Sequence, residues 1–516
     1  MAYSQAHTPM EIRTLIRSRP AVVAALLSTV LIFVGNRRGI GISWDSTDYI
    51  AVGQSMARGR GVLDVTGLPM VIRPPGLSTV VMLGDWVGLS PNISLTLLNA
   101  LSMAVVVWCT HRLLTLAEVR TSAKWLGVVL IAISPALLDI FTMAWSEPPF
   151  IALTLMALVI AVQKRSWPWE FVLTALFTAM FFVRYVGPFY AAPIALVAAL
   201  VQARSSGVVL AFLRAGAALA VSMVAPWLWL MRNRDLTGYL TGYRVPGGGT
   251  YLDPFKTFTG TLGSWLIGRP PLNGNGGIYL NWNDFSAIMQ VSGVVVWLVT
   301  VTSVVTYFFS RTARHLPATT VVGACAWLFV FYGAFSIYRF VNDEMGPLDS
   351  RMMSGLYVPL VIMLVISSDR LVSSLGAMAR SVPRALTIVA VSVIMWHGVS
   401  AMQDSIQFGR EGRHWASVTH QVAPIHLFVR GLTEDAALLS NEPQSLFAAT
   451  RRWPIRNQYL TDQPEPENCR HRYFVWYNNS FLPDGKPDRA AVLFQDASGQ
   501  VLDLGPCGAD LVTYWS

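Results

Sequence analysis

Three carboxylates stand where apolar runs of the chain end or begin. Asp45 and Asp48 follow the first long apolar run, in the stretch "GISWDSTDYIAVG", and Glu147 lies in "AWSEPPF" between two later runs. Charged side chains at the margin of a membrane segment are costly and usually functional, and a carboxylate can remove a proton from a hydroxyl group. Taken singly, each acid is equally well explained as part of a helix cap, Asp45 together with Ser46, and Glu147 before two prolines.

Four arginines stand at comparable ends of apolar runs. Arg73 precedes a rigid Pro-Pro pair in "VIRPPGL", and Arg184 lies in "FVRYVG". Arg232 lies in "WLWLMRNRDLTG" and Arg351 in "DSRMMSG". A single arginine in such a place usually reaches toward lipid headgroups. Four of them on the side of the acids indicate a phosphate site, because a guanidinium binds phosphate through two parallel hydrogen bonds.

Together, these side chains suit the transfer of a sugar from a lipid phosphate to an acceptor hydroxyl at a membrane surface. One carboxylate would take the hydroxyl proton, and the arginines would stabilise the charge that builds up on the leaving phosphate. A second carboxylate would stabilise the positive charge that develops at the anomeric carbon of the sugar.

The composition predicts the helices that must carry these groups. The 516 residues are 53% hydrophobic and 13% charged, whereas a soluble domain is about 25% charged. Apolar runs near the length of about 20 residues that a bilayer requires predict a mainly α, polytopic transmembrane helix bundle. We expect about eleven spans, near residues 20–36, 92–111, 125–144, 148–163, 168–186, 188–203, 207–231, 286–309, 316–337, 353–369 and 384–402.

Basic residues between the apolar runs orient the bundle. Their clusters place the N-terminus and several loops in the cytoplasm, so the acids, the four arginines and the C-terminal tail fall on the outer side. This orientation predicts a multi-pass membrane protein with an extracytoplasmic site. It also accounts for much of the net charge of +9 without nucleic acid as a partner.

The tail differs in composition from the rest of the chain. Residues 1–402 form the predicted membrane domain, and residues 403–516 have the composition of a soluble domain. Short β-like runs, "AALLS", "RYFVWY", "AAVLF" and "LVTYW", and a helical pattern near 408–430 predict a small extracytoplasmic α+β domain. Its two cysteines, Cys469 and Cys507, form a disulfide or remain free thiols, and the sequence favours neither. Cys109 and Cys325 lie in apolar spans and are expected to be buried.

The order of these motifs resembles that of the GT-C superfamily of integral-membrane glycosyltransferases. The bacterial branch similar to the aminoarabinose transferase ArnT and the protein O-mannosyltransferases has an acidic motif, D-[ES]-x-x-Y, in its first outer loop. Asp45, Ser46 and Tyr49 occupy those places here, and Gly53 departs from the continuation of the motif. A basic residue before Pro-Pro and an acid before proline follow in the order of that family. The resemblance covers roughly residues 10–400.

The resemblance implies an inverting glycosyltransferase, a hexosyl- or pentosyltransferase, that uses a polyprenyl-phosphate sugar as donor. The acceptor would be a lipid, glycan or protein of the cell envelope, and membrane lipid would surround the bundle. Asp45 is expected to be the general base, Glu147 a supporting acid and Asp48 a secondary one. The remaining expected contacts are to the carrier phosphate from Arg73, Arg184, Arg232 and Arg351, and to the substrate from Tyr49 and Tyr185.

The need for a metal stays open, because some members of the superfamily use a divalent cation and others do not. The three acids offer oxygen ligands of the kind that Mg²⁺ or Mn²⁺ takes, but we expect no cofactor. The alternatives to an enzyme are a transporter or flippase of a lipid-linked sugar, and a ligase or scaffold for surface glycans. A transporter often has helices that are broken near the midplane, whereas the motifs here stand at outer helix ends.

Overall fold

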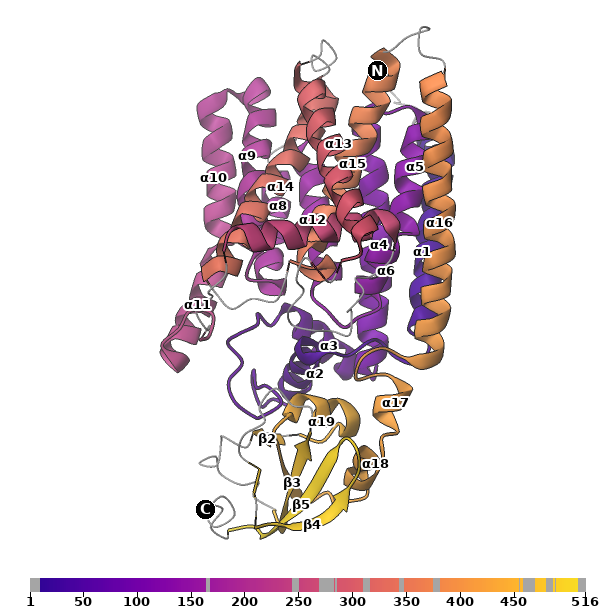
Figure 1. Cartoon of the computed structure of the whole chain (residues 1–516). Helices are drawn as coiled ribbons and strands as arrows, with labels where there is room; N and C mark the ends of the chain where they lie inside the picture. The colour runs from indigo at the N-terminus through magenta and orange to yellow at the C-terminus, as the bar shows by residue number, and fades with distance from the viewer. Residues whose placement is uncertain are drawn as a thin grey trace.

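A bundle of long helices carries a small sheet region at one end (Figure 1). The computed structural model describes residues 10–163, 168–243, 250–268, 283, 285–309, 316–342, 348–374, 381–453, 455–457, 469–478, 486–487 and 489–508. Two short helices, α2 (Trp44–Ala57) and α3 (Gly76–Trp86), lie between the bundle and the sheet (Figure 1).

Each of the predicted spans contains helix. Seven of these helices are α1 (Met10–Gly35), α4 (Pro91–Leu116), α7 (Glu147–Ala161), α8 (Pro168–Val183), α9 (Gly187–Ser206), α10 (Val208–Ser222) and α11 (Val224–Thr237). The later ones are α13 (Ala287–Phe309), α14 (Leu316–Asn342), α15 (Ser350–Ser374) and α16 (Ser381–Glu411). In the part of the chain that the structure describes, five helices are long and apolar enough to cross a membrane, and a bent pair would make six.

The bent pair replaces the single span predicted at 125–144. Helix α5 (Thr121–Ala132) and helix α6 (Pro135–Phe141) meet at an angle of 42°. Proline at position 135 has no N–H to continue the hydrogen bonding of α5, and it suits the first turn of a new helix. The side chain of Ser134 caps that helix by accepting a hydrogen bond from the Leu137 N–H at 3.3 Å. The end of α6 leads directly into the turn that precedes Glu147.

A further helix, α12 (Leu252–Ile267), lies between the spans predicted at 207–231 and 286–309. It runs across the long helices rather than along them (Figure 1). Phe258, Leu262 and Trp265 are buried against the bundle, and the Thr261 hydroxyl donates to the Leu348 carbonyl at 2.9 Å. Its apolar face is one helical stripe instead of a full circumference, which is why a search for long apolar runs passes over it.

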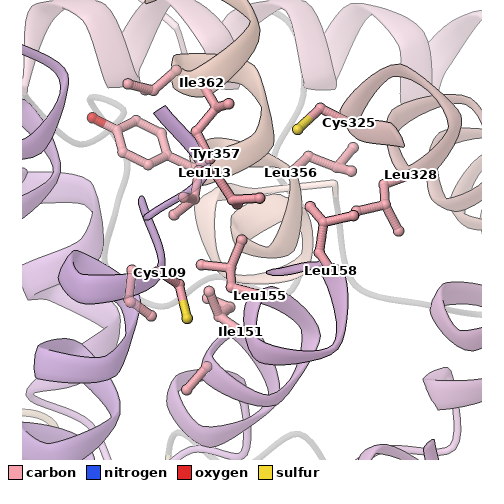
Figure 2. Close-up of a cluster of buried hydrophobic side chains, with 14 of the residues drawn as sticks. Cys109, Leu113, Ile151, Leu155, Leu158, Cys325, Leu328, Leu356, Tyr357 and Ile362 are labelled. Atoms are coloured by element: carbon pink, nitrogen blue, oxygen red, sulfur yellow. The ribbon is translucent and has the colours of Figure 1, made fainter. Parts of the chain in front are cut away.

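The interior of the bundle is apolar and closely packed. Side chains from α4, α7, α14 and α15 meet in one cluster (Figure 2). Cys109 and Cys325 are both buried there as free thiols, which confirms the expectation for these two residues. This buried cluster packs together α7 and α15, whose N-terminal ends carry Glu147 and Arg351.

The C-terminal region contains a five-stranded sheet of order β2-β1-β3-β5-β4. Its strands are β1 (Ala436–Ser440), β2 (Ile455–Asn457), β3 (His471–Tyr477), β4 (Ala491–Gln495) and β5 (Gly499–Pro506). Strand β1 pairs in parallel with β2 and β3, and β5 pairs antiparallel with β3 and β4. Three short helices accompany the sheet: α17 (Val418–Gln421), α18 (Pro424–Arg430) and α19 (Pro443–Thr450).

The sheet tests most of the predicted strands. The structure also shows whether Cys469 and Cys507 are joined. The runs "AALLS", "RYFVWY" and "AAVLF" coincide with β1, β3 and β4, whereas "LVTYW" falls outside the described residues. A disulfide joins Cys469 to Cys507. It connects the start of β3 to the end of β5.

The sheet region shares one core with the loop between α1 and α4, which includes α2 and α3. Ile50 and Val65 of the loop are buried in the same cluster as Phe447 and Val475 of the tail. The Ile455 N–H donates to the Val65 carbonyl at 2.9 Å. The loop that carries Asp45 and Asp48 is therefore packed between the bundle and the sheet instead of lying free in solvent.

Candidate active site

Helix α2 begins one residue before Asp45 and leaves that carboxylate free for other partners. Ser43 is the N-cap, and its N–H donates to the Ser46 hydroxyl at 3.1 Å. The sequence analysis had left open a capping role for Asp45 together with Ser46. Because the cap is formed by Ser43 and Ser46, Asp45 instead points its carboxylate at two arginines.

Arg73 binds both acids of α2. Its Nη2 contacts Asp45 Oδ1, and its Nη1 lies 2.9 Å from Asp48 Oδ2. Residue 73 precedes Pro74 and Pro75, and α3 begins at Gly76, where a side chain would clash with the Phe182 carbonyl. The rigid Pro-Pro pair and this close approach fix the backbone direction of Arg73.

Arg351 joins the two loops that carry acids. Its Nη2 contacts Asp45 Oδ2, and its Nε donates to Glu147 Oε1 at 2.8 Å. Arg184 contacts the same Glu147 oxygen at 2.5 Å. The result is an alternating row in which every acid contacts an arginine. We call it the acid–arginine row, and its members are Asp48, Arg73, Asp45, Arg351, Glu147 and Arg184.

Neutral side chains complete the surroundings of the row. The Tyr49 hydroxyl donates to the Ser146 hydroxyl at 3.2 Å, and Arg184 Nη1 donates to the same oxygen at 3.1 Å. The guanidinium of Arg351 lies 4.3 Å from the centre of the Trp145 ring, within the range of a cation–π contact. Five of the six charged side chains are less than a quarter exposed, and Asp45 is 25% exposed.

The electrostatics of the two acids of α2 differ. Burial alone would raise the pKa of Asp45, but the guanidiniums of Arg351 and Arg73 outweigh it and hold that pKa well below its usual range. Asp48 has one arginine partner and lies deeper, and burial raises its pKa to about 7. Asp45 is thus firmly ionised while both arginines hold it, and Asp48 titrates near neutral pH.

Two predicted residues lie in a second polar group instead of the row. Arg232 Nη1 donates to the Met70 carbonyl at 3.3 Å and to Asn233 Oδ1 at 3.0 Å. The Tyr185 hydroxyl donates to the Val71 carbonyl at 2.8 Å and accepts from the Asn233 amide at 3.1 Å. We call this the tyrosine–amide group. It borders the segment that leads to Arg73, but no carboxylate among the described residues contacts Arg232.

The donor set of the row does not suit a divalent cation. Mg²⁺ and Mn²⁺ require several oxygen ligands around one point, whereas guanidiniums separate the three carboxylates of the row. No cluster of three acidic, histidine or cysteine side chains capable of holding a metal occurs within the described ranges.

Sequence reasoning missed several residues of the site. Ser146 bridges Tyr49 and Arg184, and Trp145 donates from its indole to the Ser43 hydroxyl at 2.7 Å. Asp349 caps α15 through the Met352 N–H at 2.9 Å, and burial raises its pKa to about 6. Ser146 and Trp145 adjoin Glu147 in "AWSEPPF". Their position beside a predicted site residue was the signal in the sequence that could have identified them.

Comparison with known proteins concerns the fold. The sequence matches no protein-family model and no curated protein. The structure is similar to that of ArnT from Cupriavidus metallidurans bound to undecaprenyl phosphate, with a TM-score of 0.58 and 15% identity over 94% of this chain and 98% of that one. It is also similar to arabinofuranosyltransferase AftD from Mycobacteria, with a TM-score of 0.52 and 14% identity over 95% of this chain and 40% of AftD.

A third similar structure is the oligosaccharyltransferase of Archaeoglobus fulgidus, with a TM-score of 0.50 and 11% identity over 89% of this chain and 68% of that one. The chain has the GT-C fold. The resemblance first seen in short motifs therefore extends to the arrangement of the helices. In this GT-C fold, the acid–arginine row lies at the end of the bundle that faces the sheet region, where the loops that carry the acids meet the helices.

Proposed function

We propose that this protein is an inverting glycosyltransferase of a bacterial inner membrane. It moves a sugar from a polyprenyl-phosphate carrier to an extracytoplasmic acceptor of the cell envelope. The observation that carries the proposal is the acid–arginine row, in which Asp45 lies between two arginines. ArnT, which was solved with undecaprenyl phosphate bound, supports a lipid phosphate as the anion that these arginines receive.

In the proposed reaction, the acceptor oxygen attacks the anomeric carbon as its proton passes to Asp45. The bond between that carbon and the carrier oxygen breaks, and the polyprenyl phosphate leaves with the bonding electrons. Arg73 and Arg351 stabilise the charge on the phosphate, since guanidinium and phosphate match in geometry. Glu147 lies across Arg351 from Asp45 and stabilises the positive charge at the sugar.

The arginines also account for the protonation state of the base. A carboxylate with a depressed pKa is a weak base, and Asp45 is in that state while it binds Arg73 and Arg351. A carrier phosphate competes for the same guanidiniums, so its arrival raises the pKa of Asp45 toward the ordinary value. The base becomes active when the donor is present. The reaction needs no divalent metal, because the arginines supply the positive charge.

The proposal is tested in cells that lack the chain. Wild type, Asp45→Asn and Asp85→Asn are expressed to equal membrane abundance, and envelope lipids and glycans are compared by mass spectrometry. Asp85 is an exposed acid on α3, so its variant is a matched control. We expect wild type and Asp85→Asn to restore one sugar modification, and Asp45→Asn to lower it by about 10²–10⁴-fold, the usual contribution of a general base.

Two outcomes would contradict the proposal in different ways. Full restoration by Asp45→Asn removes this residue as the base. Identical glycans with and without the wild-type chain argue against sugar transfer altogether. Accumulation of the lipid-linked sugar on the cytoplasmic face would instead favour a flippase.

A further inference from the structure

Three loop segments from distant parts of the chain run parallel beside the site. The Gly41 N–H donates to the Thr142 carbonyl, and the Ala144 N–H donates to the Gly41 carbonyl, both at 2.9 Å. The Trp415 N–H donates to the Ile42 carbonyl at 3.0 Å. These backbone bonds connect the first outer loop, the turn before α7 and the segment after α16.

Two of these segments lead directly into the acids. Ile42 precedes Asp45 by three positions, and Ala144 precedes Glu147 by three positions. Each acid lies in the first turn of the helix that follows its segment. The relative placement of the two segments therefore sets the distance between the two carboxylates, which Arg351 bridges.

Arg413, in the third segment, binds the chain on the other side of the turn. Its guanidinium donates to the Asp139 carbonyl, to Asp139 Oδ1 and, at 2.7 Å, to the Thr142 hydroxyl. The side chain is 11% exposed, and its guanidinium lies 4.1 Å from the centre of the Phe408 ring. Arg413, which follows α16, is thus bound to the end of α6 and to Thr142. The carbonyl of Thr142 is the one that accepts the hydrogen bond from Gly41.

Two side chains pack closely against Gly41. A Cβ at this position would lie 2.2 Å from Met143 Sδ and 3.0 Å from Arg413 Cβ. The aliphatic stem of Arg413 and the side chain of Met143 therefore close on the backbone of the first loop. A larger residue at this position would force Met143 to move, so glycine is favoured by this close approach and not by its backbone angles.

We propose that Arg413 is a positioning residue for glycosyl transfer, which fixes the turn before Glu147 against the loop before Asp45. This inference rests on the proposed function. Arg413 contacts neither of the acids, so it acts through the backbone of residues 41–42 and 142–144. A misplacement of about 1 Å between reacting groups can cost about 10²-fold in rate. The carrier phosphate is bound by other arginines, so carrier affinity should not depend on Arg413.

The test measures transfer from the native donor in isolated membranes, and binding of undecaprenyl phosphate to the purified full-length protein. Arg413→Met should lower the transfer rate at least about tenfold, with the affinity for undecaprenyl phosphate unchanged within about twofold. Arg413→Lys keeps the charge near Asp139 but not the forked geometry, so its rate should be intermediate. Arg410→Met, at an exposed arginine of α16, is the matched control and should behave as wild type.

A double-mutant cycle separates positioning from general stability. If Arg413 acts by placing Glu147, then Arg413→Met should cost less than about threefold in a Glu147→Gln background, because the effects of coupled residues are not additive. Equal losses in both backgrounds, or weaker carrier binding with an unchanged rate, would overturn the inference. If Arg413→Met does not fold, the same cycle with Arg413→Lys gives the answer. Inactivity of the wild type would refute the proposed function instead.

Discussion

The two polar groups at the helix ends differ in the partners that their arginines contact. In the acid–arginine row, carboxylates already contact Arg73, Arg184 and Arg351. In the tyrosine–amide group, Arg232 contacts a carbonyl and an amide oxygen, and its guanidinium lies 4.5 Å from the centre of the Trp229 ring. An anion must displace carboxylates to reach the first group, but only neutral oxygens to reach the second.

Under the proposed function, we expect this difference to give the two groups separate tasks. Ion pairs within the row fix the geometry of the acids and keep their charges from repelling one another. The positive charge of Arg232 is not offset by a contacting acid in the described parts of the chain, so we expect it to attract the carrier phosphate of the proposed reaction more strongly. The two groups adjoin the same stretch, since Met70 and Val71 accept hydrogen bonds from the tyrosine–amide group and Arg73 belongs to the row.

Arg351→Met is expected to have the largest effect, because it breaks the row in the middle. The variant leaves Asp45 and Glu147 without their common partner, and removal of one member of a buried ion pair costs about 3–5 kcal/mol. We expect a loss of transfer of at least about 10²-fold together with a lower unfolding temperature, measured by mass spectrometry of products and by thermal unfolding in detergent.

The control for this variant is Arg58→Met, at an exposed arginine that follows α2. It should change neither quantity. If Arg351→Met retained wild-type stability, Asp45 and Glu147 would not need this arginine to compensate their buried charge. The ion pairs of the acid–arginine row would then have no larger structural role than the contacts of the tyrosine–amide group.

Arg232→Met is expected to act on binding rather than on stability. Hydrogen bonds to a charged group contribute about 1.5–3 kcal/mol, which corresponds to about a 10- to 100-fold weaker affinity for undecaprenyl phosphate. Its unfolding temperature should change less than that of Arg351→Met, because its partners are neutral and it is partly exposed. Titration of the purified protein with undecaprenyl phosphate measures the affinity.

Arg234→Met is the matched control, since Arg234 is exposed and lies two positions further along α11. Affinity that is equal in Arg232→Met and Arg234→Met would show that Arg232 has no part in receiving the phosphate. Both polar groups would then have to be interpreted as structural.

The sequence predicted the members of the row better than their partners. Asp45, Glu147 and the arginines could be found because each stands at the end of an apolar run, where a charge is costly. Their pairing includes contacts between residues more than 200 positions apart, such as Arg351 with Glu147, and a local sequence pattern does not predict such contacts. The placement of Arg232 in another group has the same cause.

The fold was predictable to a similar degree. Long apolar runs gave the helices of the bundle, and alternating β-like runs gave three of the strands. The bend at Pro135 was missed because it lies inside a single apolar run of membrane length. The crosswise helix α12 was missed because its apolar residues form no run of that length. The core that the first loop shares with the sheet was also missed, since it is formed by residues such as Ile50 and Val475, which are far apart in the chain.

Asp48→Asn is expected to have the smallest effect, and it tests the charge state inside the row. The unfolded carboxyl group loses its proton near pH 4, whereas burial raises the pKa of folded Asp48 to about 7. Between these values the folded state binds a proton that the unfolded state does not, so this group makes the free energy of unfolding fall as pH rises from about 4 to 7. The asparagine variant removes that contribution.

We therefore expect the unfolding temperature of the wild type to fall more between pH 5.5 and pH 8 (chosen to bracket a pKa of about 7) than that of Asp48→Asn, by a few degrees. Asp85→Asn should follow the wild type. The contact with Arg73 at 2.9 Å acts in the opposite direction, because it stabilises the ionised carboxylate. If Asp48→Asn were instead the less stable protein at pH 8, the ion pair would outweigh burial, and the row would hold three ionised acids, with none of them poised to titrate near neutral pH.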